Sequence, residues 1–147
     1  MNRLLFIFTL WAAKLTGFLI SILNLGRAFN VPGRVALKLD PNFLQKFNIT
    51  EGKCKIIFIT GTNGKSTTCG LVANFLKTAG YKVIYNKTGA NLKSGIVSTL
   101  SKYSDLIGRL QYNFILLEVD EATLHLVTKD LKPFLIAVTN LFRDQLA

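Results

Sequence analysis

The chain has 147 residues, 50% hydrophobic and 18% charged, a composition typical of a globular domain with an apolar core rather than of a disordered chain. Two cysteines, Cys54 and Cys69, are too few for a disulfide framework or a four-cysteine zinc site. With 18 basic and 8 acidic residues the net charge is +10, which favours an anionic partner such as a nucleotide phosphate, a nucleic acid or an acidic lipid.

The first predicted element is an apolar helix at the amino terminus. Residues 4–26 form an almost uninterrupted apolar stretch with a thin polar stripe, and the stretch is long enough to cross a bilayer. Lys14 divides it, which costs roughly 2.5 to 3.5 kcal/mol on insertion scales and fits poorly with a signal peptide. Three interpretations stay open: a helix buried against its own protein or a partner, a helix on a membrane surface, and a true span.

A connector is predicted between this helix and a new unit that begins at about Lys53. Residues 30–33 have the composition of a turn, Pro41-Asn42 predicts another, and residues 43–47 show a short helical pattern. We therefore divide the chain into an apolar helix with its connector, residues 1–52, and a nucleotide-binding unit, residues 53–147.

A buried strand, a glycine-containing loop and a helix are predicted in succession from Lys55. Residues 55–60 are a β-branched and aromatic run, typical of a strand in a parallel sheet. The run leads directly into Gly61-Thr-Asn-Gly-Lys-Ser-Thr, and apolar residues then recur at helical spacing until Gly80. In this context the Lys65 ammonium neutralises charge on the β- and γ-phosphates of a nucleotide, and the Ser66 hydroxyl can bind Mg²⁺.

The glycine loop is shorter than the strict Walker motif, because Ile59 rather than glycine lies five positions before Gly64. The alternative is that Gly61 and Gly64 merely form a tight turn and that Lys65 is a solvated residue at a helix start. That alternative places a lysine at the positive end of a helix dipole, which is unfavourable without an anion. We therefore expect the loop to bind phosphate.

Three further strands are predicted, over residues 82–86, 113–119 and 134–139. The second ends at three clustered acids, Glu118, Asp120 and Glu121, and the third leads to Asn140. Because the carboxyl ends of parallel strands share one edge of a sheet, Glu118 is our first choice for a Mg²⁺ ligand, although a solvated helix start also explains the cluster. The predicted fold class is α/β, a P-loop type parallel sheet flanked by helices and preceded by the apolar helix.

Residues 61–68 resemble the ATP-binding loop of the Mur ligase family, whose members join an amine to a carboxylate through an acyl phosphate. Residues 86–92, 118–122 and 139–146 resemble a narrower branch, the ligase-like subunit of lipid II isoglutaminyl synthase, as does the apolar helix with Trp11. The resemblance implies that residues 53–147 are the amino-terminal part of the family's central ATP-binding domain.

The resemblance also implies roles for single residues. Lys65 and Glu118 would be catalytic, Ser66 and Glu118 would hold Mg²⁺, and the muramyl substrate would face Thr88, Gly89 and Asn91. The residues that would bind ATP are Gly61, Thr62, Asn63, Gly64, Lys65, Ser66, Thr67 and Asn140. Many members have a histidine metal ligand where this sequence has Gln145, so a metal contact at Gln145 stays open.

The reaction implied is the ATP-dependent amidation of the α-carboxylate of D-glutamate in lipid II to D-isoglutamine. Ammonia would come from a GatD-like glutaminase partner, and the enzyme would work in the cytoplasm or at the inner face of the plasma membrane. The alternatives are another ligase of the family, similar to folylpolyglutamate or cyanophycin synthetase, and a membrane-tethered P-loop module without ligase activity. Nucleic-acid binding rests on net charge alone, so no nucleic-acid partner is expected.

The chain stops shortly after the fourth predicted strand. The remaining strands and the carboxy-terminal domain of the family have no counterpart in these 147 residues, so we expect an amino-terminal part of a longer ligase that is inactive alone. A four-stranded layer would leave a sheet edge and apolar faces uncovered, and we therefore expect aggregation or dependence on a partner.

Overall fold

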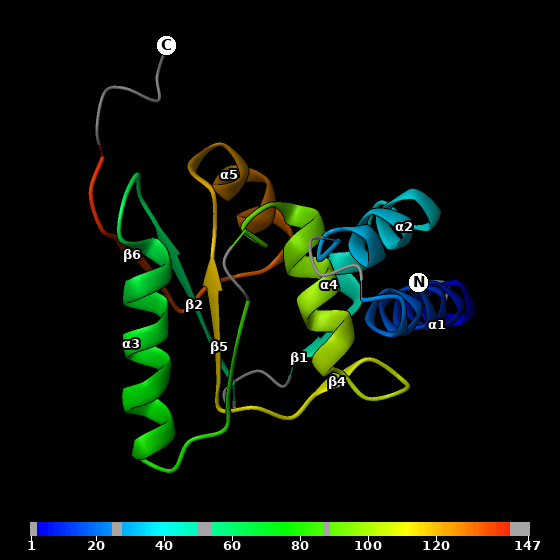
Figure 1. Ribbon diagram of the computed structural model, residues 1–147, viewed down its shortest axis with the longest axis horizontal. Coiled ribbons are helices and arrows are strands. Elements are labelled where there is room, and N and C mark those ends of the chain that lie inside the picture. Colours follow the sequence, from blue (N-terminus) through cyan, green and yellow to red (C-terminus); the bar gives the residue numbers. More distant parts are fainter. Residues whose placement is uncertain (1–2, 25–27, 50–53, 87–88, 142–147) are drawn as a thin grey trace.

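The structure, a computed structural model, describes residues 3–24, 28–49, 54–86 and 89–141. A parallel sheet of four strands lies at its centre (Figure 1), in the spatial order β3 (Val83–Tyr85), β5 (Phe114–Glu118), β2 (Lys55–Thr60) and β6 (Leu135–Val138). The central strands β5 and β2 are short apolar runs, and β5 has four buried residues in a row, as expected where helices cover both faces of a sheet. All four carboxyl ends therefore lie at one edge.

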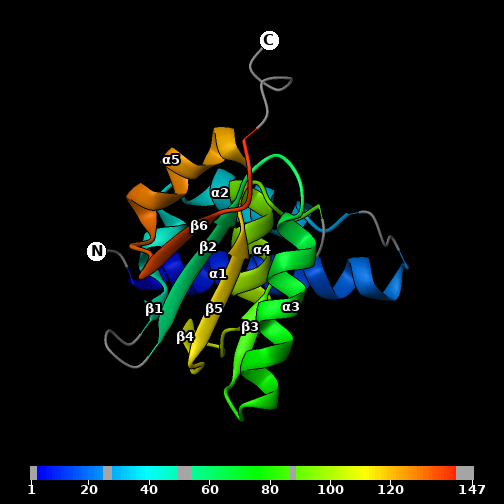
Figure 2. The same cartoon turned by 90° about the vertical axis from the view of Figure 1, so that its left-hand side faces the viewer.

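Helices cover the two faces of the sheet unequally. Among the helices of the described residues, α3 (Lys65–Thr78) lies on one face, and α4 (Lys93–Tyr103) and α5 (Glu121–Asp130) lie on the other (Figure 1). Helices α1 (Arg3–Ile22) and α2 (Val31–Leu39) pack outside α4, and α1 runs across the sheet strands rather than along them (Figure 2). The amino-terminal helices thus form an additional layer.

A second, two-stranded parallel sheet joins the amino-terminal segment to the rest of the molecule. Strand β1 (Asn48–Ile49) follows the 3-10 helix η1 (Phe43–Lys46) and pairs with β4 (Arg109–Leu110). Phe43 and Phe47 pack against Phe6 of α1, with ring centroids 5.0 and 5.6 Å from that of Phe6, the first ring tilted and the second edge-on. These rings belong to the same buried cluster as the inner faces of β2 and β5.

The predicted parallel α/β fold is confirmed, but residues 30–33 are not a turn. They begin helix α2, with Pro32 in its first turn. Backbone N–H groups in the first turn have no partner within the helix, so proline, which lacks this group, loses no hydrogen bond there. Helix α4 was not predicted at all, because Gly95 interrupts its pattern. A Cβ on Gly95 would lie 2.5 Å from the carbonyl oxygen of Ala90, so this glycine serves close packing rather than a turn.

Among the described residues, α1 is the one helix long and apolar enough to cross a membrane by length and composition, with a mean hydropathy of 1.8. Only 22% of this apolar stretch of α1 is buried inside the structure. One side of α1, with Phe6, Leu10 and Ala13, enters the core. The opposite side is exposed and apolar.

Candidate functional site at the carboxyl edge of the sheet

The loop between β2 and α3 needs glycine at both ends. Gly61 has φ 125° and Gly64 has φ 81°, values that side-chain-bearing residues rarely adopt. A Cβ on Gly61 would also lie 2.3 Å from the hydroxyl oxygen of Thr139. The glycines therefore allow a sharp turn that passes directly against the end of β6.

The amino end of α3 is arranged to receive an anion. Its N-cap is Gly64, which supplies no side-chain cap, and the first turn contains no acidic residue. The first amides of a helix have no partner within the helix, and the helix dipole makes this end positive. A phosphate group is the ligand that such an end binds in strand–loop–helix units.

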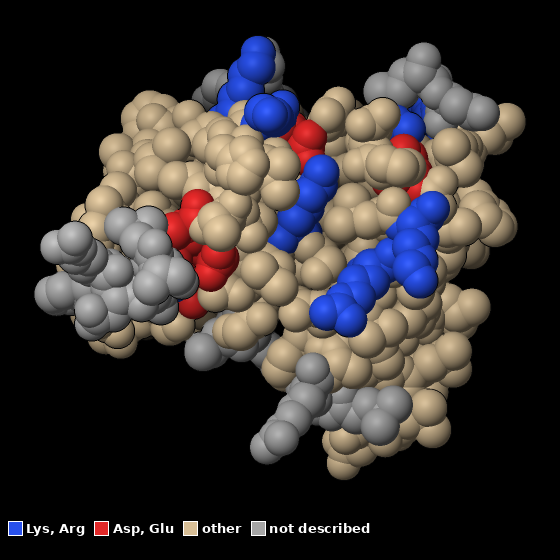
Figure 3. All heavy atoms as spheres, turned by 90° about the horizontal axis from the view of Figure 1, so that it is seen from above, with Lys and Arg blue, Asp and Glu red and all other residues tan. Residues whose placement is uncertain are grey.

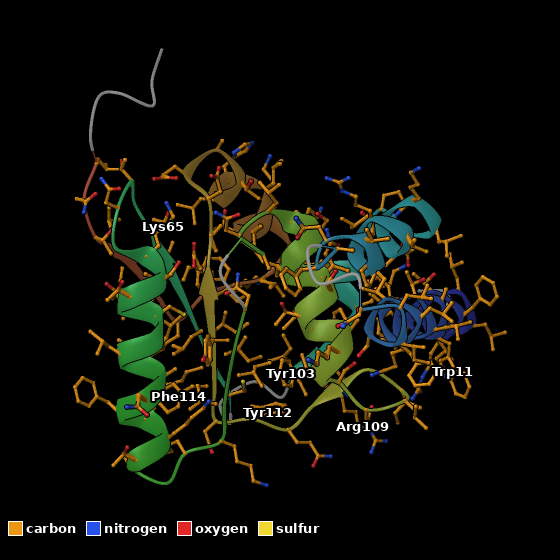
Figure 4. The ribbon with its side chains drawn as sticks, in the orientation of Figure 1. Trp11, Lys65, Tyr103, Arg109, Tyr112 and Phe114 are labelled. Carbon is orange, nitrogen blue, oxygen red and sulfur yellow. The ribbon has the colours of Figure 1, made fainter. Side chains whose placement is uncertain are left out.

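The Lys65 side chain folds back over the loop. Its ammonium donates hydrogen bonds to the carbonyl oxygens of Gly61 and Thr62, the latter at 3.3 Å, and lies 3.5 Å from Oε1 of Glu121. Figure 4 shows Lys65 at the top of α3, beside the carboxyl ends of the strands. The positive charge is thus held at the mouth of the loop, within reach of a group bound there.

Ser66 at the start of α3 contacts Glu118 at the end of β5, the strand beside β2. The Ser66 hydroxyl donates a 2.7 Å hydrogen bond to Oε2 of Glu118. Glu118 is only 5% exposed. Register brings them together, because β5 pairs with β2 so that Glu118 lies opposite Ile59. The Asn86 side chain fixes the end of β5 by accepting from the Glu118 amide at 2.7 Å and donating to its carbonyl at 2.8 Å.

The three clustered acids have separate surroundings. Glu118 faces Ser66 and Glu121 faces Lys65, whereas Asp120 caps α5 by accepting from the Ala122 amide at 3.0 Å. Across the described ranges, no group of three or more His, Cys, Asp or Glu residues could hold a metal ion. Mg²⁺ commonly binds through one or two carboxylates together with phosphate oxygens and water, so the Ser66 and Glu118 oxygens fit a Mg²⁺ that arrives with a nucleotide. The buried Oε1 of Glu121 has no hydrogen-bond partner among the described residues.

Residues after β6 hold the loop in position. The Asn140 side chain accepts from the Asn63 amide at 3.0 Å and donates to the Asn63 carbonyl at 3.1 Å, while the Asn140 carbonyl accepts from the Thr62 amide at 2.9 Å. The Thr139 hydroxyl donates to the same Asn63 carbonyl at 2.6 Å. Asn140 therefore contacts the loop backbone directly. The amides of Thr62 and Asn63 both donate their hydrogen bonds to Asn140.

Neither cysteine has the properties of a nucleophile. Burial, assisted by the nearby charge of Glu118, raises the pKa of the Cys69 thiol to about 12, and burial raises the pKa of Cys54 to about 11. Both thiols therefore stay protonated near neutral pH. The chemistry of the described residues at this edge is that of oxygen ligands, the Lys65 ammonium group and backbone amides.

The structure brings most of the predicted site residues to this one edge. The Asn91 carbonyl accepts from the Asp120 amide at 3.0 Å, which places Asn91 beside the acidic cluster, and Gly89 is exposed nearby in the chain with φ 85°. Thr67 is exposed in the first turn of α3. Thr88 and Gln145 lie outside the described residues.

Sequence reasoning missed Asn86, Thr139 and the contact of Glu121 with Lys65. Asn86 and Thr139 each directly follow a strand, so their positions at the carboxyl edge were available as a signal. Glu121 gave no such signal, because its approach to Lys65 depends on where α5 begins relative to α3.

Comparison with known proteins places these features in a family context. The Mur ligase middle domain matches residues 59–146. The subunit MurT of lipid II isoglutaminyl synthase (glutamine-hydrolyzing) from Streptococcus pneumoniae is 38% identical over 138 residues, 93% of this chain and 29% of that protein. MurT from Staphylococcus aureus strain COL is 36% identical over 120 residues, 82% of this chain and 26% of that protein.

More distant similarities support the same fold. The UDP-N-acetylmuramoylalanine–D-glutamate ligase of Fusobacterium nucleatum is 36% identical over 94 residues, 64% of this chain and 19% of that protein. The crystal structure of MurF from Acinetobacter baumannii superposes with a TM-score of 0.53 at 17% identity, covering 71% of this chain and 22% of MurF. The chain thus spans less than a third of the length of each of these relatives.

Proposed function

Because the chain belongs to the Mur ligase family, we propose that it is the ATP-binding part of an amide-forming ligase of peptidoglycan synthesis. The observation that carries the proposal is the meeting of Ser66 and Glu118, 2.7 Å apart, with Lys65 beside an uncapped helix amino end. A carboxylate, a hydroxyl, an ammonium group and the amides of the first turn of α3 together match the Mg²⁺ and phosphates of ATP.

In this proposal the side chains of the carboxyl edge have distinct tasks. The residues of the loop and the start of α3 bind the phosphates, Lys65 exchanges its bonds to the loop carbonyls for the terminal phosphates, and Asn140 holds the loop. Ser66 and Glu118 would hold Mg²⁺, which when bound supplies positive charge that offsets the charge on the transferring phosphoryl group. Substrate contacts are proposed for Thr88, Gly89 and Asn91.

The proposed reaction has two steps. An oxygen of the α-carboxylate of D-glutamate attacks the γ-phosphorus of ATP, the bond to the β-phosphate oxygen breaks, and ADP leaves. Ammonia then attacks the carbon of the acyl phosphate, phosphate leaves, and a proton is lost to give the amide of D-isoglutamine. No residue forms a covalent bond in this scheme, which agrees with the high thiol pKa values of Cys54 and Cys69.

The substrate and partner are proposed from the names of the similar proteins. MurT is named there as a subunit of a glutamine-hydrolyzing lipid II isoglutaminyl synthase, so lipid II and a GatD-like glutaminase are the corresponding substrate and partner here. An enzyme acting on this precursor would work in the cytoplasm, close to the inner face of the plasma membrane.

The test is a calorimetric titration of ATP with Mg²⁺ into the protein and its Lys65→Ala variant. Removing the ammonium should weaken ATP binding by at least about tenfold, because charge-assisted hydrogen bonds contribute on the order of 1.5–3 kcal/mol. In a full-length ligase with its glutaminase, the same variant should lose ATP-dependent amidation of lipid II.

The matched control is Lys77→Ala, which removes an exposed lysine from the last turn of the same helix. It should bind ATP as the unmodified protein does. Equal ATP affinity in the Lys65→Ala variant and the unmodified protein would contradict the nucleotide site. If the full-length ligase binds ATP but does not amidate lipid II, the nucleotide site stands and the proposed substrate is wrong.

A further inference from the structure

Helix α1 presents a continuous apolar stripe to solvent. Six of its large apolar side chains are between 54% and 80% exposed: Leu4, Phe8, Trp11, Leu15, Phe18 and Ile22. They are spaced by three or four residues, so they follow one face of the helix along its whole length. A contiguous exposed apolar surface of this kind marks a site of interaction with a protein or a membrane.

Other positions of α1 are attached to the protein. Phe6 and Leu10 are buried in the core, and the Lys14 ammonium donates hydrogen bonds of 2.6 and 2.7 Å to the carbonyl oxygens of Ser101 and Ser104. Burial lowers the pKa of Lys14, which the charge of Asp105 partly opposes. A membrane-spanning α1 would have to break these contacts, whereas a helix that lies flat with its stripe outward keeps all of them.

A short apolar loop extends the stripe beyond α1. The indole N–H of Trp11 donates a 3.1 Å hydrogen bond to the carbonyl oxygen of Leu106, and both Leu106 and Ile107 are exposed. Trp11 lies at the outer edge of the molecule in Figure 4, and Arg109, the first residue of β4 after this loop, is labelled below it. The carboxylate of Asp105 accepts from the amides of Ile107 and Arg109 and is thereby engaged within the loop.

The helix that packs on α1 carries exposed basic side chains. Helix α1 contains no acidic residue, and α2 exposes Arg34 and Lys38 beside it. In Figure 3 a diagonal row of basic side chains crosses the face above α2. The acid nearest to α2 in the chain, Asp40, is buried and paired with Lys46 at 2.6 Å, so it does not cancel this charge.

We propose that α1 docks the protein on an anionic membrane surface, lying in the plane of the interface with its apolar stripe at the boundary between headgroups and acyl chains. Aromatic and aliphatic residues on one exposed face are the pattern of interfacial helices, and the positive charge of the neighbouring helix α2 complements anionic headgroups. The inference depends on this surface alone and not on the ligase chemistry.

The test uses the intrinsic fluorescence of Trp11, the sole tryptophan of the chain, together with flotation on density gradients. Vesicles of phosphatidylcholine and phosphatidylglycerol should float the protein and shift the Trp11 emission to shorter wavelength. Pure phosphatidylcholine vesicles should bind it less, and added salt should weaken binding to the anionic vesicles. Aggregated protein sinks and is thus separated from vesicle-bound protein.

The decisive variant is Phe8→Gln with Leu15→Gln, which removes two exposed apolar side chains without disturbing the core. We expect vesicle binding at least roughly tenfold weaker. The matched control is Leu71→Gln with Phe75→Gln, a comparably exposed pair on α3, which should bind as the unmodified protein does. Circular dichroism checks that each variant is folded, and Arg34→Gln with Lys38→Gln should weaken binding to anionic vesicles only.

Three results would overturn the proposal. One is unchanged vesicle binding in the Phe8 and Leu15 double variant. Another is stronger quenching of Trp11 fluorescence by lipids brominated at the ends of their acyl chains than by lipids brominated near the headgroup, which would indicate that α1 spans the membrane. The third is self-association through the stripe without vesicle binding, which would assign it to a second copy of the chain. Binding is measured without ATP, so a failure here leaves the nucleotide site unaffected.

Discussion

Asn140 illustrates how a single side chain links two elements of the site. It follows β6 in sequence, yet it donates to and accepts from the backbone of Asn63 in the loop after β2. The loop glycines have wide conformational freedom, so its shape depends on such contacts. Asn140 is therefore a positioning residue in the proposed ATP site.

We expect Asn140→Ala to weaken ATP binding about tenfold, the equivalent of about 1.4 kcal/mol, because the loop loses two side-chain hydrogen bonds. Calorimetry with ATP and Mg²⁺ measures this. The control is Asn113→Ala, since the Asn113 side chain likewise accepts from a backbone amide, that of Lys82 at 2.8 Å, but precedes β5 and so lies at the opposite edge of the sheet. Equal losses of ATP affinity in both variants would show a general effect on stability instead.

At the scale of elements, α2 and α4 approach each other so closely that one contact excludes a side chain. A Cβ on Gly33 of α2 would lie 1.8 Å from the carbonyl oxygen of Ser94 and 2.9 Å from the Ser98 hydroxyl oxygen. The Gly33 amide donates to that hydroxyl at 2.8 Å. Glycine here permits two helix backbones to pack nearly in contact.

Gly33→Ala should lower the free energy of unfolding by about 1–3 kcal/mol, because backbone atoms must move apart. Gly70 of α3 is the matched control, since a Cβ there would meet nothing within 4 Å. Gly70→Ala should raise the free energy of unfolding by about 0.5–1 kcal/mol, the usual gain from alanine in a helix interior. Urea denaturation measures both, and a shift of the same sign in the two variants would contradict the proposed close packing.

At the scale of the whole molecule, β6 is an exposed edge of the central sheet. It is last in the strand order, and Phe134, Leu135 and Val138 are each at least half exposed. Apolar edge strands present unpaired backbone groups to other chains. The sheet of the described residues thus has a surface suited to self-association.

We expect the 147-residue chain, expressed alone, to elute as oligomers in size-exclusion chromatography. Leu135→Lys should increase the monomer fraction, because a charge on an edge strand opposes pairing. The control is Leu126→Lys, which places the same charge on exposed α5 and should leave the elution unchanged. A monomeric chain that melts cooperatively would count against this prediction.

The elements predicted correctly are those whose signals are local. Residues 55–78 combine an apolar run, two glycines and helical spacing within one short segment, so the β2–loop–α3 unit could be predicted from neighbouring residues alone. Residues 113–119 and 134–139 gave strands for the same reason. Helix α4 could not be predicted, because its glycine serves a contact with Ala90 that has no local signature.

The amino-acid sequence by itself determined the glycine loop between β2 and α3 and the parallel strands, since both depend on residues adjacent in the chain. Only the tertiary structure decided that Glu118 faces Ser66 while Glu121 faces Lys65, and that the stripe from Leu4 to Ile22 points outward. The physical reason is that strand register and helix orientation follow from packing between distant segments. Lys14 is the clearest case, because its partners are the carbonyls of Ser101 and Ser104, almost ninety residues away.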